Sequence, residues 1–178
     1  MSVGLEDIRE MSAPEKIKSF AEIAAIIKKL AEDEVDVTVG QGVFDIVHLG
    51  HVGYLRASQN VDPNALVIVG LENDETIRGN KGASRPVNPL EDRLEVIAEF
   101  MSTGLVFAYE DTPRYTHPED YIKRQKALGS VAISVPVWDP HLGLKAYQAN
   151  EAGTRLALVD YRHTNSTTRM LREVGFEE

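Results

Sequence analysis

The sequence predicts an α/β fold, in which a mostly parallel sheet is covered by helices on both faces. Short apolar runs alternate along the chain with longer segments of helical periodicity. The most continuous run, residues 65–71, is apolar throughout, as in a strand that is buried on both faces. Strands that alternate with helices are joined by right-handed crossovers, so neighbouring strands are expected to be parallel.

The first expected element is a helix that begins at Ser12. Ser12 and Glu15 form a capping box, in which a hydroxyl and a carboxylate each bond a free amide of the first turn. Apolar side chains follow at helical spacing and predict one buried stripe, made of Ile17, Phe20, Ala24, Ile27 and Ala31. We expect residues 1–32 to form a leading helical segment, packed on the rest of a single domain that spans 1–178.

The later elements are expected to alternate. The expected strands are 35–39, 65–71, 105–109, 131–135 and 156–160, and the expected helices are 51–60, 88–101, 119–128 and 166–174. Asn88 is the expected cap of the second of these helices, whose inner stripe would be Leu90, Leu94, Ile97 and Met101. Ligands of such sheets bind at the carboxyl ends of the strands.

Composition and charge exclude several classes of protein. The chain has 178 residues and no cysteine, which excludes disulfides, thiolate metal sites and cysteine nucleophiles. A net charge of −9 argues against a nucleic-acid partner or an anionic membrane surface. No apolar run approaches the roughly 20 residues of a membrane helix, and the first residues lack the pattern of a secretory signal. We therefore expect a soluble cytoplasmic protein.

The turn after the strand at 35–39 carries the candidate chemistry. It reads Gly40-Gln-Gly-Val-Phe-Asp-Ile-Val-His-Leu-Gly-His51. His48 and His51 are three residues apart at the start of a helix, so they share one face, and Gly50 leaves room for a ligand near the backbone. The free amides and partial positive charge of a helix start suit a phosphate. Two surface histidines beside turn glycines are the alternative interpretation.

The segment 42–51 resembles the signature of the cytidylyltransferase-like nucleotidyltransferases. Further motifs match in the family's order: Asn73-Asp-Glu, Lys81-Gly, Ser84-Arg-Pro-Val-Asn-Pro-Leu-Glu-Asp-Arg93, Glu110-Asp-Thr-Pro113 and Ser166-Thr-Thr-Arg169. The resemblance covers residues 16–172 and is greatest to the adenylyltransferase domain of bacterial ADP-heptose synthesis. It implies a Rossmann-like, HxGH-type fold that transfers a nucleotidyl group from a nucleoside triphosphate to a phosphorylated metabolite, uses Mg²⁺ and forms homodimers.

The resemblance also implies roles for the matching residues. His48 and His51 would donate hydrogen bonds to the triphosphate, and Lys81 would reach the phosphates from a flexible loop at 78–82. The nucleotide would lie against Gly42, Val43, Phe44, Gly50, Arg85, Ser166, Thr167, Thr168 and Arg169. The acceptor would lie against Asp45, Asn73, Trp138 and Asp139. The motifs assign no metal ligand.

Many of these residues have a structural interpretation as well. Core packing is the alternative for Phe44 and Trp138, and a solvated surface charge is the alternative for Lys81 and Arg93. Turn, capping or loop-ordering roles are the alternatives for Asp45, Asn73, Arg85 and the hydroxyls of 166–168. The sequence departs from the family at Val135-Pro-Val-Trp-Asp139, where the family has Val-Lys-Gly-x-Asp, so the acceptor stays open.

These observations lead to three functional hypotheses. The first is the transfer of AMP from ATP to a sugar 1-phosphate such as heptose 1-phosphate, with release of pyrophosphate. The second is cytidylyl transfer from CTP to glycerol 3-phosphate or another polyol phosphate. The third is a nucleotide-binding module of the same fold without turnover.

Overall fold

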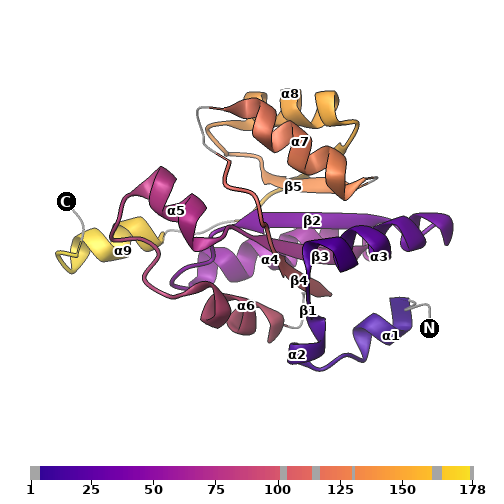
Figure 1. The fold of residues 1–178 in the computed structure, drawn as a ribbon, viewed down its shortest axis with the longest axis horizontal. Helices are drawn as coiled ribbons and strands as arrows, with labels where there is room; N and C mark the ends of the chain where they lie inside the picture. Colours follow the sequence, from indigo (N-terminus) through magenta and orange to yellow (C-terminus); the bar gives the residue numbers. More distant parts are fainter. Residues whose placement is uncertain (1–4, 101–103, 114–116, 130, 162–165, 177–178) are drawn as a thin grey trace.

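The computed structural model describes residues 5–100, 104–113, 117–129, 131–161 and 166–176, and its six strands form one parallel sheet (Figure 1). The strand order is β1-β4-β3-β2-β5-β6, and each neighbouring pair is parallel. The strands are β1 (Ile17–Lys18), β2 (Val37–Gly42), β3 (Leu66–Leu71), β4 (Leu105–Ala108), β5 (Ala132–Pro136) and β6 (Arg155–Val159). The predicted α/β class and parallel sheet are confirmed.

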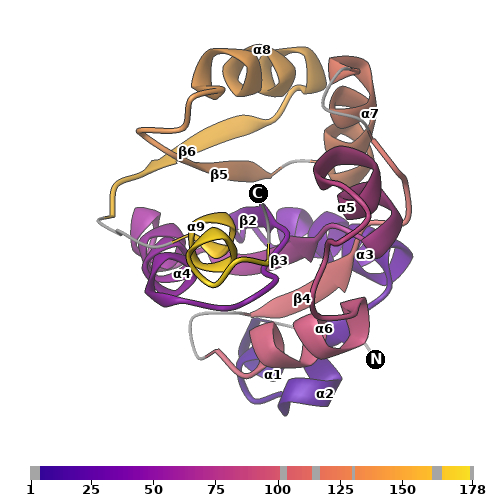
Figure 2. The ribbon, with the colours of Figure 1, turned by 90° about the vertical axis from the view of Figure 1, so that its left-hand side faces the viewer.

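Helices cover both faces of this sheet. They are α1 (Leu5–Arg9), α2 (Ala13–Lys16), α3 (Phe20–Glu32), α4 (Leu49–Val61), α5 (Asp74–Lys81), α6 (Leu90–Ala98), α7 (Pro118–Leu128), α8 (Leu142–Ala152) and α9 (Thr167–Glu173). Figure 2 shows α4 on one side of the strands and α3 and α7 on the other. Both α5 and α9 lie at the left-hand end of the molecule in Figure 1.

The two faces of the sheet build two apolar cores. Alternate strand residues point to opposite faces, so Ile68 joins the core under α3 and α7 while Val69 joins the core under α4 and α6. Ile23, Ile27 and Leu30 of α3 belong to the first core. Within the described residues, no helix is both long enough and apolar enough to cross a bilayer.

The prediction of one helix from Ser12 was wrong. The capping box at Ser12 and Glu15 forms, but α2 ends at Lys16 and residues 17–18 pair with β4 as the edge strand β1. A second capping box at Ser19 and Glu22 then starts α3, with the Ser19 amide donating to the Glu22 carboxylate at 2.8 Å. This second cap fixes a new helical register, so the buried positions are Ile23, Ile27 and Leu30, whereas Ala24 is half-buried and Ala31 exposed.

Other boundaries also differ from the prediction. The strand predicted at 35–39 lies at 37–42, because the Val35 amide still bonds the Leu30 carbonyl in the turn after α3. Asn88 does not cap α6; Pro89 occupies the cap position. The loop expected at 78–82 is the end of α5, and Lys81 is the last helical residue. Helices α1, α5 and α8 were not predicted, and Met101 lies outside the described residues.

Candidate active site

The turn from β2 into α4 is built around Phe44, which has a positive φ of 49°. This left-handed conformation costs a non-glycine residue about 1–3 kcal/mol unless packing holds it. Here the Phe44 ring is buried, and a Cβ placed on Gly42 would come within 2.9 Å of it. The Phe44 ring centroid also lies 5.2 Å from that of His51. Gly42 is therefore required by the ring that supports His51, which gives Phe44 the packing role.

The structure brings the two predicted histidines together at the start of α4. His48 is the N-cap, and its Nδ1 accepts a hydrogen bond from the Gly50 amide at 3.0 Å. The rings of His48 and His51 stack, with centroids 3.9 Å apart and planes 20° apart. Because Nδ1 of His48 is an acceptor, the proton of its neutral ring is on Nε2, which makes Nε2 a donor.

The start of α9 is tied to the same turn. Thr167 Oγ1 donates to the carbonyl of Ile46 at 3.3 Å, which joins segments 121 residues apart in the sequence. Ser166 Oγ caps α9 by accepting from the Arg169 amide at 3.2 Å. Arg169 is exposed and pairs with Glu173 one turn along the helix. The closing Ser-Thr-Thr motif therefore lies beside the turn that holds the histidines. Ser166 makes the predicted capping contact, whereas the bond from Thr167 to Ile46 was not predicted.

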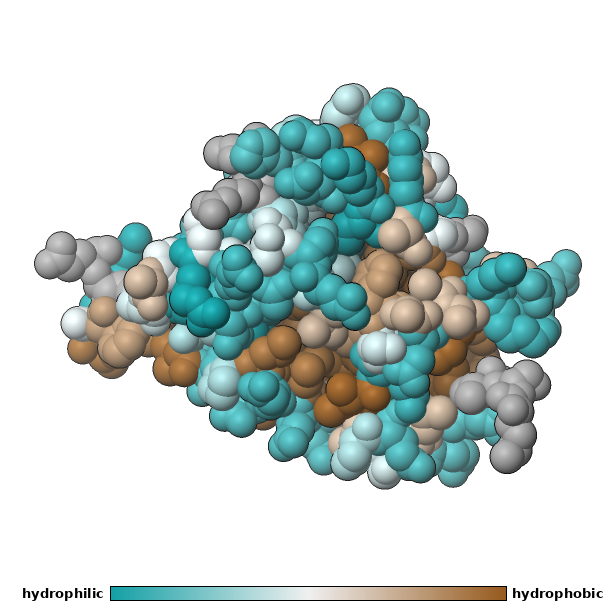
Figure 3. Space-filling model, viewed as in Figure 1, coloured by the Kyte–Doolittle hydropathy of each residue, from teal (hydrophilic) through white to brown (hydrophobic). Residues whose placement is uncertain are grey.

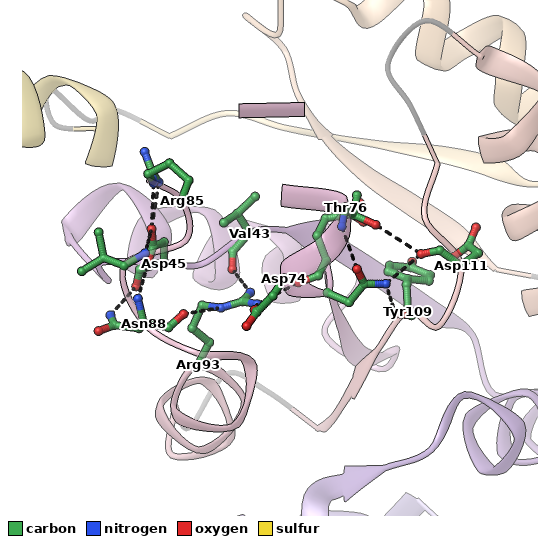
Figure 4. A network of polar contacts seen from close by, with 12 residues as sticks. Val43, Asp45, Asp74, Thr76, Arg85, Asn88, Arg93, Tyr109 and Asp111 are labelled. Carbon is green, nitrogen blue, oxygen red and sulfur yellow. Dashed lines mark hydrogen bonds and ion pairs between the residues drawn. The ribbon is translucent and has the colours of Figure 1, made fainter. Parts of the chain in front are cut away.

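Asp45 and Arg85 form a buried ion pair that holds the loop 85–88 on this turn (Figure 4). The Arg85 guanidinium contacts the Asp45 carboxylate at 2.9 and 3.0 Å. The amides of Val87 and Asn88 donate to the same carboxylate at 3.0 and 2.9 Å. Both side chains thus perform the turn-stabilising and loop-ordering roles that the sequence left as alternatives.

Arg93 is a buried crosslink, so its interpretation as a surface charge of its helix was wrong. It is 1% exposed, although it lies on α6. Its guanidinium donates to the carbonyls of Val43 at 2.6 Å and Glu72 at 3.0 Å and pairs with the Asp74 carboxylate at 2.6 Å (Figure 4). Arg93 therefore fixes the segments after β2 and β3 relative to each other.

Asn73 and Lys81 lie at opposite ends of α5. Asn73 caps the helix by accepting from the Thr76 amide, and its own amide donates to the carbonyls of Tyr109 and Asp111 at 2.9 and 2.8 Å. Lys81 is exposed and is followed by Gly82, whose φ of 99° ends the helix. Asn73 thus connects the loops after β3 and β4, and Lys81 is the last residue of α5, directly before Gly82.

A second buried arginine, Arg124 of α7, was not predicted. It pairs with Glu72 at 2.7 Å and with Asp111 at 2.9 Å, and its Cζ lies 3.7 Å from the ring centroid of Tyr109. Burial lowers the pKa of Arg124, but hydrogen bonds and the charge of Glu72 outweigh burial and raise it. The guanidinium therefore stays charged. The sequence did carry one signal for a buried cation: the carboxylate of Glu72 directly follows the fully apolar strand β3.

Tyr54 of α4 fills the space where β2 and β5 separate. The paired register between these strands ends at Val39 and Ile133. Beyond it, the Tyr54 hydroxyl accepts from the Gln41 amide at 3.2 Å and lies 3.0 Å from the Ser134 carbonyl, to which it donates. The chain leaves β2 for β3 on one side and β5 lies on the other, so this is the point where such sheets bind ligands.

The segment after β5 places Trp138 and Asp139 at the same edge of the sheet. Trp138 is 48% exposed, so its core interpretation was wrong; its Nε1 donates to the Tyr161 carbonyl at 3.3 Å. Asp139 accepts from Lys145 Nζ at 2.7 Å and from the His141 amide at 2.8 Å. Burial pushes the pKa of Asp139 upward, but these two hydrogen bonds outweigh it and hold the pKa below its ordinary value.

A pocket of about 470 Å³ lies between the turn and α6, and neither histidine is in its lining. Its lining includes the carboxylates of Asp45, Asp92 and Glu95, which does not suit a triphosphate. No group of three or more His, Asp or Glu side chains among the described residues is arranged to hold a metal ion. The described side chains therefore do not form a complete protein cage for Mg²⁺.

Comparison with known proteins agrees with this architecture. The chain is 32% identical over 163 residues to the "Bifunctional protein HldE" of Sulfurimonas denitrificans, covering 89% of this chain and 31% of the relative. It is 35% identical over 188 residues to the protein of that name from Campylobacter jejuni strain RM1221, covering 98% of this chain and 35% of the relative. The chain thus spans about a third of the length of these curated relatives.

Solved structures share the fold at low sequence identity. A lipopolysaccharide core biosynthesis protein from Thermoplasma volcanium superposes with a TM-score of 0.54 at 20% identity, over 73% of this chain and 98% of its own. Pantothenate synthetase from Thermus thermophilus superposes with a TM-score of 0.57 at 12% identity, over 84% of this chain and 63% of its own. The family profile described as Cytidylyltransferase-like matches residues 39–172, most of the chain and all of the site above. The chain belongs to the cytidylyltransferase-like family.

Proposed function

We propose that this chain is a nucleotidyltransferase that transfers AMP from ATP to a sugar 1-phosphate of the heptose 1-phosphate kind and releases pyrophosphate. The observation that carries the proposal is the stacked pair His48 and His51 at the start of α4, at the carboxyl edge of a parallel sheet in a cytidylyltransferase-like chain. Similarity to HldE proteins supports the sugar acceptor. A structural neighbour described as complexed with beta-gamma ATP supports the donor.

The proposed reaction needs no covalent enzyme intermediate. A phosphate oxygen of the acceptor attacks the α-phosphorus of ATP and forms a new P–O bond. The bond from the α-phosphorus to the oxygen that bridges it to the β-phosphorus breaks, and its electron pair leaves on pyrophosphate. The protein has to align the two phosphates and stabilise the charge that develops on them. Because Nδ1 of His48 accepts from the Gly50 amide, we propose its Nε2 as a donor for this task, with the His51 ring stacked beside it.

The remaining predicted site residues keep their roles as proposals. Lys81 would approach the phosphates when the segment around Gly82 moves. The nucleotide would lie over Gly42, Val43, Phe44 and Gly50 and against Ser166, Thr167, Thr168 and Arg169, with Arg85 acting through its loop. On the acceptor side we keep Asp45, acting through the same loop, and Asn73, Trp138 and Asp139.

The surroundings of the proposed reaction follow from the family resemblance. Mg²⁺ would arrive on the triphosphate, since this ion is usually held by substrate phosphates, waters and one or two carboxylates. The proposal also includes a single domain in the cytoplasm, a homodimer, and a nucleoside triphosphate and a phosphorylated sugar or polyol as substrates.

The direct test measures pyrophosphate release. The purified chain is incubated with Mg²⁺, each of ATP, CTP, GTP and UTP, and a panel of sugar and polyol phosphates, and the products are identified by mass spectrometry. We expect release with ATP and heptose 1-phosphate. Lys81→Ala should lower turnover, whereas the control Lys28→Ala, on the exposed side of α3, should not.

Two other results would contradict this proposal and support one of the other two functional hypotheses. The family description itself favours cytidylyl transfer as the second candidate, and release with CTP and glycerol 3-phosphate alone would establish it. Binding of a triphosphate without release across the whole panel would show a nucleotide-binding module.

A further inference from the structure

We propose that Gln41 and Tyr109 form a contact site for neutral hydroxyl groups of the acceptor, on the face of the sheet opposite α4. The inference rests on the proposed function, because it names the part of the substrate that this second face recognises. Neither residue is among those that the sequence analysis assigned to the nucleotide or to the acceptor.

The first observation is a pair of buried polar atoms without hydrogen bonds. Within the described part of the chain, Nε2 of Gln41 and Oη of Tyr109 are shielded from solvent and have no hydrogen-bond partner. Tyr109 is 1% exposed as a whole, whereas the rest of the Gln41 side chain is partly exposed. More than about 90% of buried polar groups in proteins are paired, and an unpaired one is costly. Two such atoms at one site indicate a polar partner that binds there.

Sheet register places the two side chains next to each other. Gln41 of β2 is paired with Gly70 of β3, and paired residues of parallel strands project to the same face. Gly70 has no side chain, and a Cβ there would lie 2.6 Å from Cε2 and 2.8 Å from Cζ of Tyr109. The Tyr109 ring therefore occupies the space over Gly70, beside Gln41. Both strand positions are one residue before the carboxyl ends of β2 and β3, where ligands of parallel sheets bind.

The charges around Tyr109 select against a phosphate. Arg124 covers the Tyr109 ring, but its guanidinium is paired with both Glu72 and Asp111. Two carboxylates against one guanidinium leave the cluster with a net negative charge, which repels an anion. Gln41 Nε2 donates, and Tyr109 Oη can donate or accept, so a neutral hydroxyl satisfies both. Burial raises the pKa of Tyr109, so its hydroxyl keeps the proton.

The site is connected to the proposed chemistry through β2. Gln41 is followed by Gly42 and the turn that carries His48, and the Tyr54 hydroxyl holds the Gln41 amide at 3.2 Å. The phosphates of the two substrates would meet over α4, while the hydroxyl-bearing end of the acceptor reaches across the sheet edge toward Gln41 and Tyr109. In this proposal, the α4 face of the sheet edge binds the phosphates, and the opposite face binds the neutral hydroxyls of the acceptor.

Tyr109→Phe and Gln41→Leu test the inference, with Tyr147→Phe on the exposed face of α8 as the control. KM is measured for heptose 1-phosphate and for ATP, the inhibition constant is measured for glycerol 3-phosphate as a competitor of the acceptor, and the thermal midpoint is measured for each variant. We expect Tyr109→Phe and Gln41→Leu to raise the KM for heptose 1-phosphate about 3- to 10-fold, with a smaller effect on glycerol 3-phosphate, which has fewer hydroxyls. The KM for ATP should change less than about twofold.

Stability distinguishes a ligand site from an internal structural contact. Removing an unpaired buried hydroxyl leaves no partner unsatisfied, so Tyr109→Phe should keep or raise the thermal midpoint. A lowered midpoint with an unchanged KM for heptose 1-phosphate would show a buried structural water and overturn the inference. Calorimetry of heptose 1-phosphate binding to the wild-type chain separates the two proposals. Binding that Tyr109→Phe weakens without any turnover refutes only the transferase, and no binding and no turnover refutes both.

Discussion

Replacing Arg85 by methionine removes the cation from a carboxylate that solvent does not reach. The side chains of Arg85 and Asp45 are 2% and 1% exposed, and their charged atoms are 2.9 Å apart. Breaking a buried pair by removing one partner costs about 3–5 kcal/mol, because the remaining charge stays buried. Asp45 keeps the amide hydrogen bonds of Val87 and Asn88, so we expect about 3 kcal/mol. At about 2–4 °C per kcal/mol for a chain of this size, the melting temperature should fall by about 6–12 °C.

A double-mutant cycle isolates the pair itself. Asp45→Asn keeps an oxygen that accepts from the loop amides but carries no charge, so adding it to Arg85→Met removes the isolated buried charge. Urea denaturation of the two single variants and the double variant should give a coupling energy of about 0.5–3 kcal/mol. Arg155→Met is the matched control, because Arg155 pairs with Asp36 at the surface and should cost less than about 1 kcal/mol.

One result would refute this reasoning. If Arg85→Met unfolds at the same urea concentration as Arg155→Met while the KM for ATP rises, Arg85 does not hold the loop and contacts the triphosphate directly.

Three further variants test the site and its supports. His48→Asn keeps a side-chain oxygen that can accept from the Gly50 amide, but it loses the ring donor. We expect pyrophosphate release to fall about 10²–10³-fold, with less than about 1 kcal/mol lost from the free energy of unfolding. Release at the wild-type rate would exclude His48 as a donor. Arg93→Met leaves the carbonyls of Val43 and Glu72 and the carboxylate of Asp74 without their cation. The free energy of unfolding in urea should therefore fall by about 3–5 kcal/mol. An unchanged urea midpoint would contradict the crosslink. The depressed pKa of Asp139 stabilises the fold at pH above its unfolded value of about 3.9, and this contribution is lost as the pH falls through the folded pKa. The melting temperatures of wild type and Lys145→Met should therefore differ at pH 5 and converge as the pH falls below 4, and a constant difference would show that Lys145 does not set this pKa.

The fold could be predicted where a hydrophobic pattern continued over several consecutive residues. The run at 65–71 and the strand positions near 105 and 132 are apolar over most of their length, so their pattern alone indicates buried strands. Helix α5 was missed because it is only eight residues long and buries only Thr76 and Ile77, too few for a helical stripe. The break at Ser19 was missed because its capping box lies inside an apolar pattern that continues through it.

From residue spacing alone, the candidate site could be predicted only where its residues are close in sequence; the distant Ser-Thr-Thr motif beside the same turn was predicted from the family resemblance. His48 and His51 lie within one turn of helix, so their spacing alone puts them on one face. Arg93 bonds a carbonyl 50 residues away and Arg124 a carboxylate 52 residues away, and no local pattern distinguishes a buried arginine from a surface one. Their partners become visible only when the ends of β2, β3 and β4 are placed side by side.

The three residues Gly40, Gln41 and Gly42 show how one strand end serves both faces of the sheet. The two glycines face α4. A Cβ on Gly42 would lie 2.9 Å from the Phe44 ring, so bare backbone is needed there, whereas a Cβ on Gly40 would make an ordinary contact with Tyr54 at 3.4 Å. Because side chains alternate along a strand, Gln41 must project to the opposite face, toward the space over Gly70. The glycines therefore shape the side that carries His51, and the single residue between them supplies a polar group to the other side. Figure 3 shows mostly hydrophilic surface at the top of the molecule, over α7 and α8, and hydrophobic patches lower down.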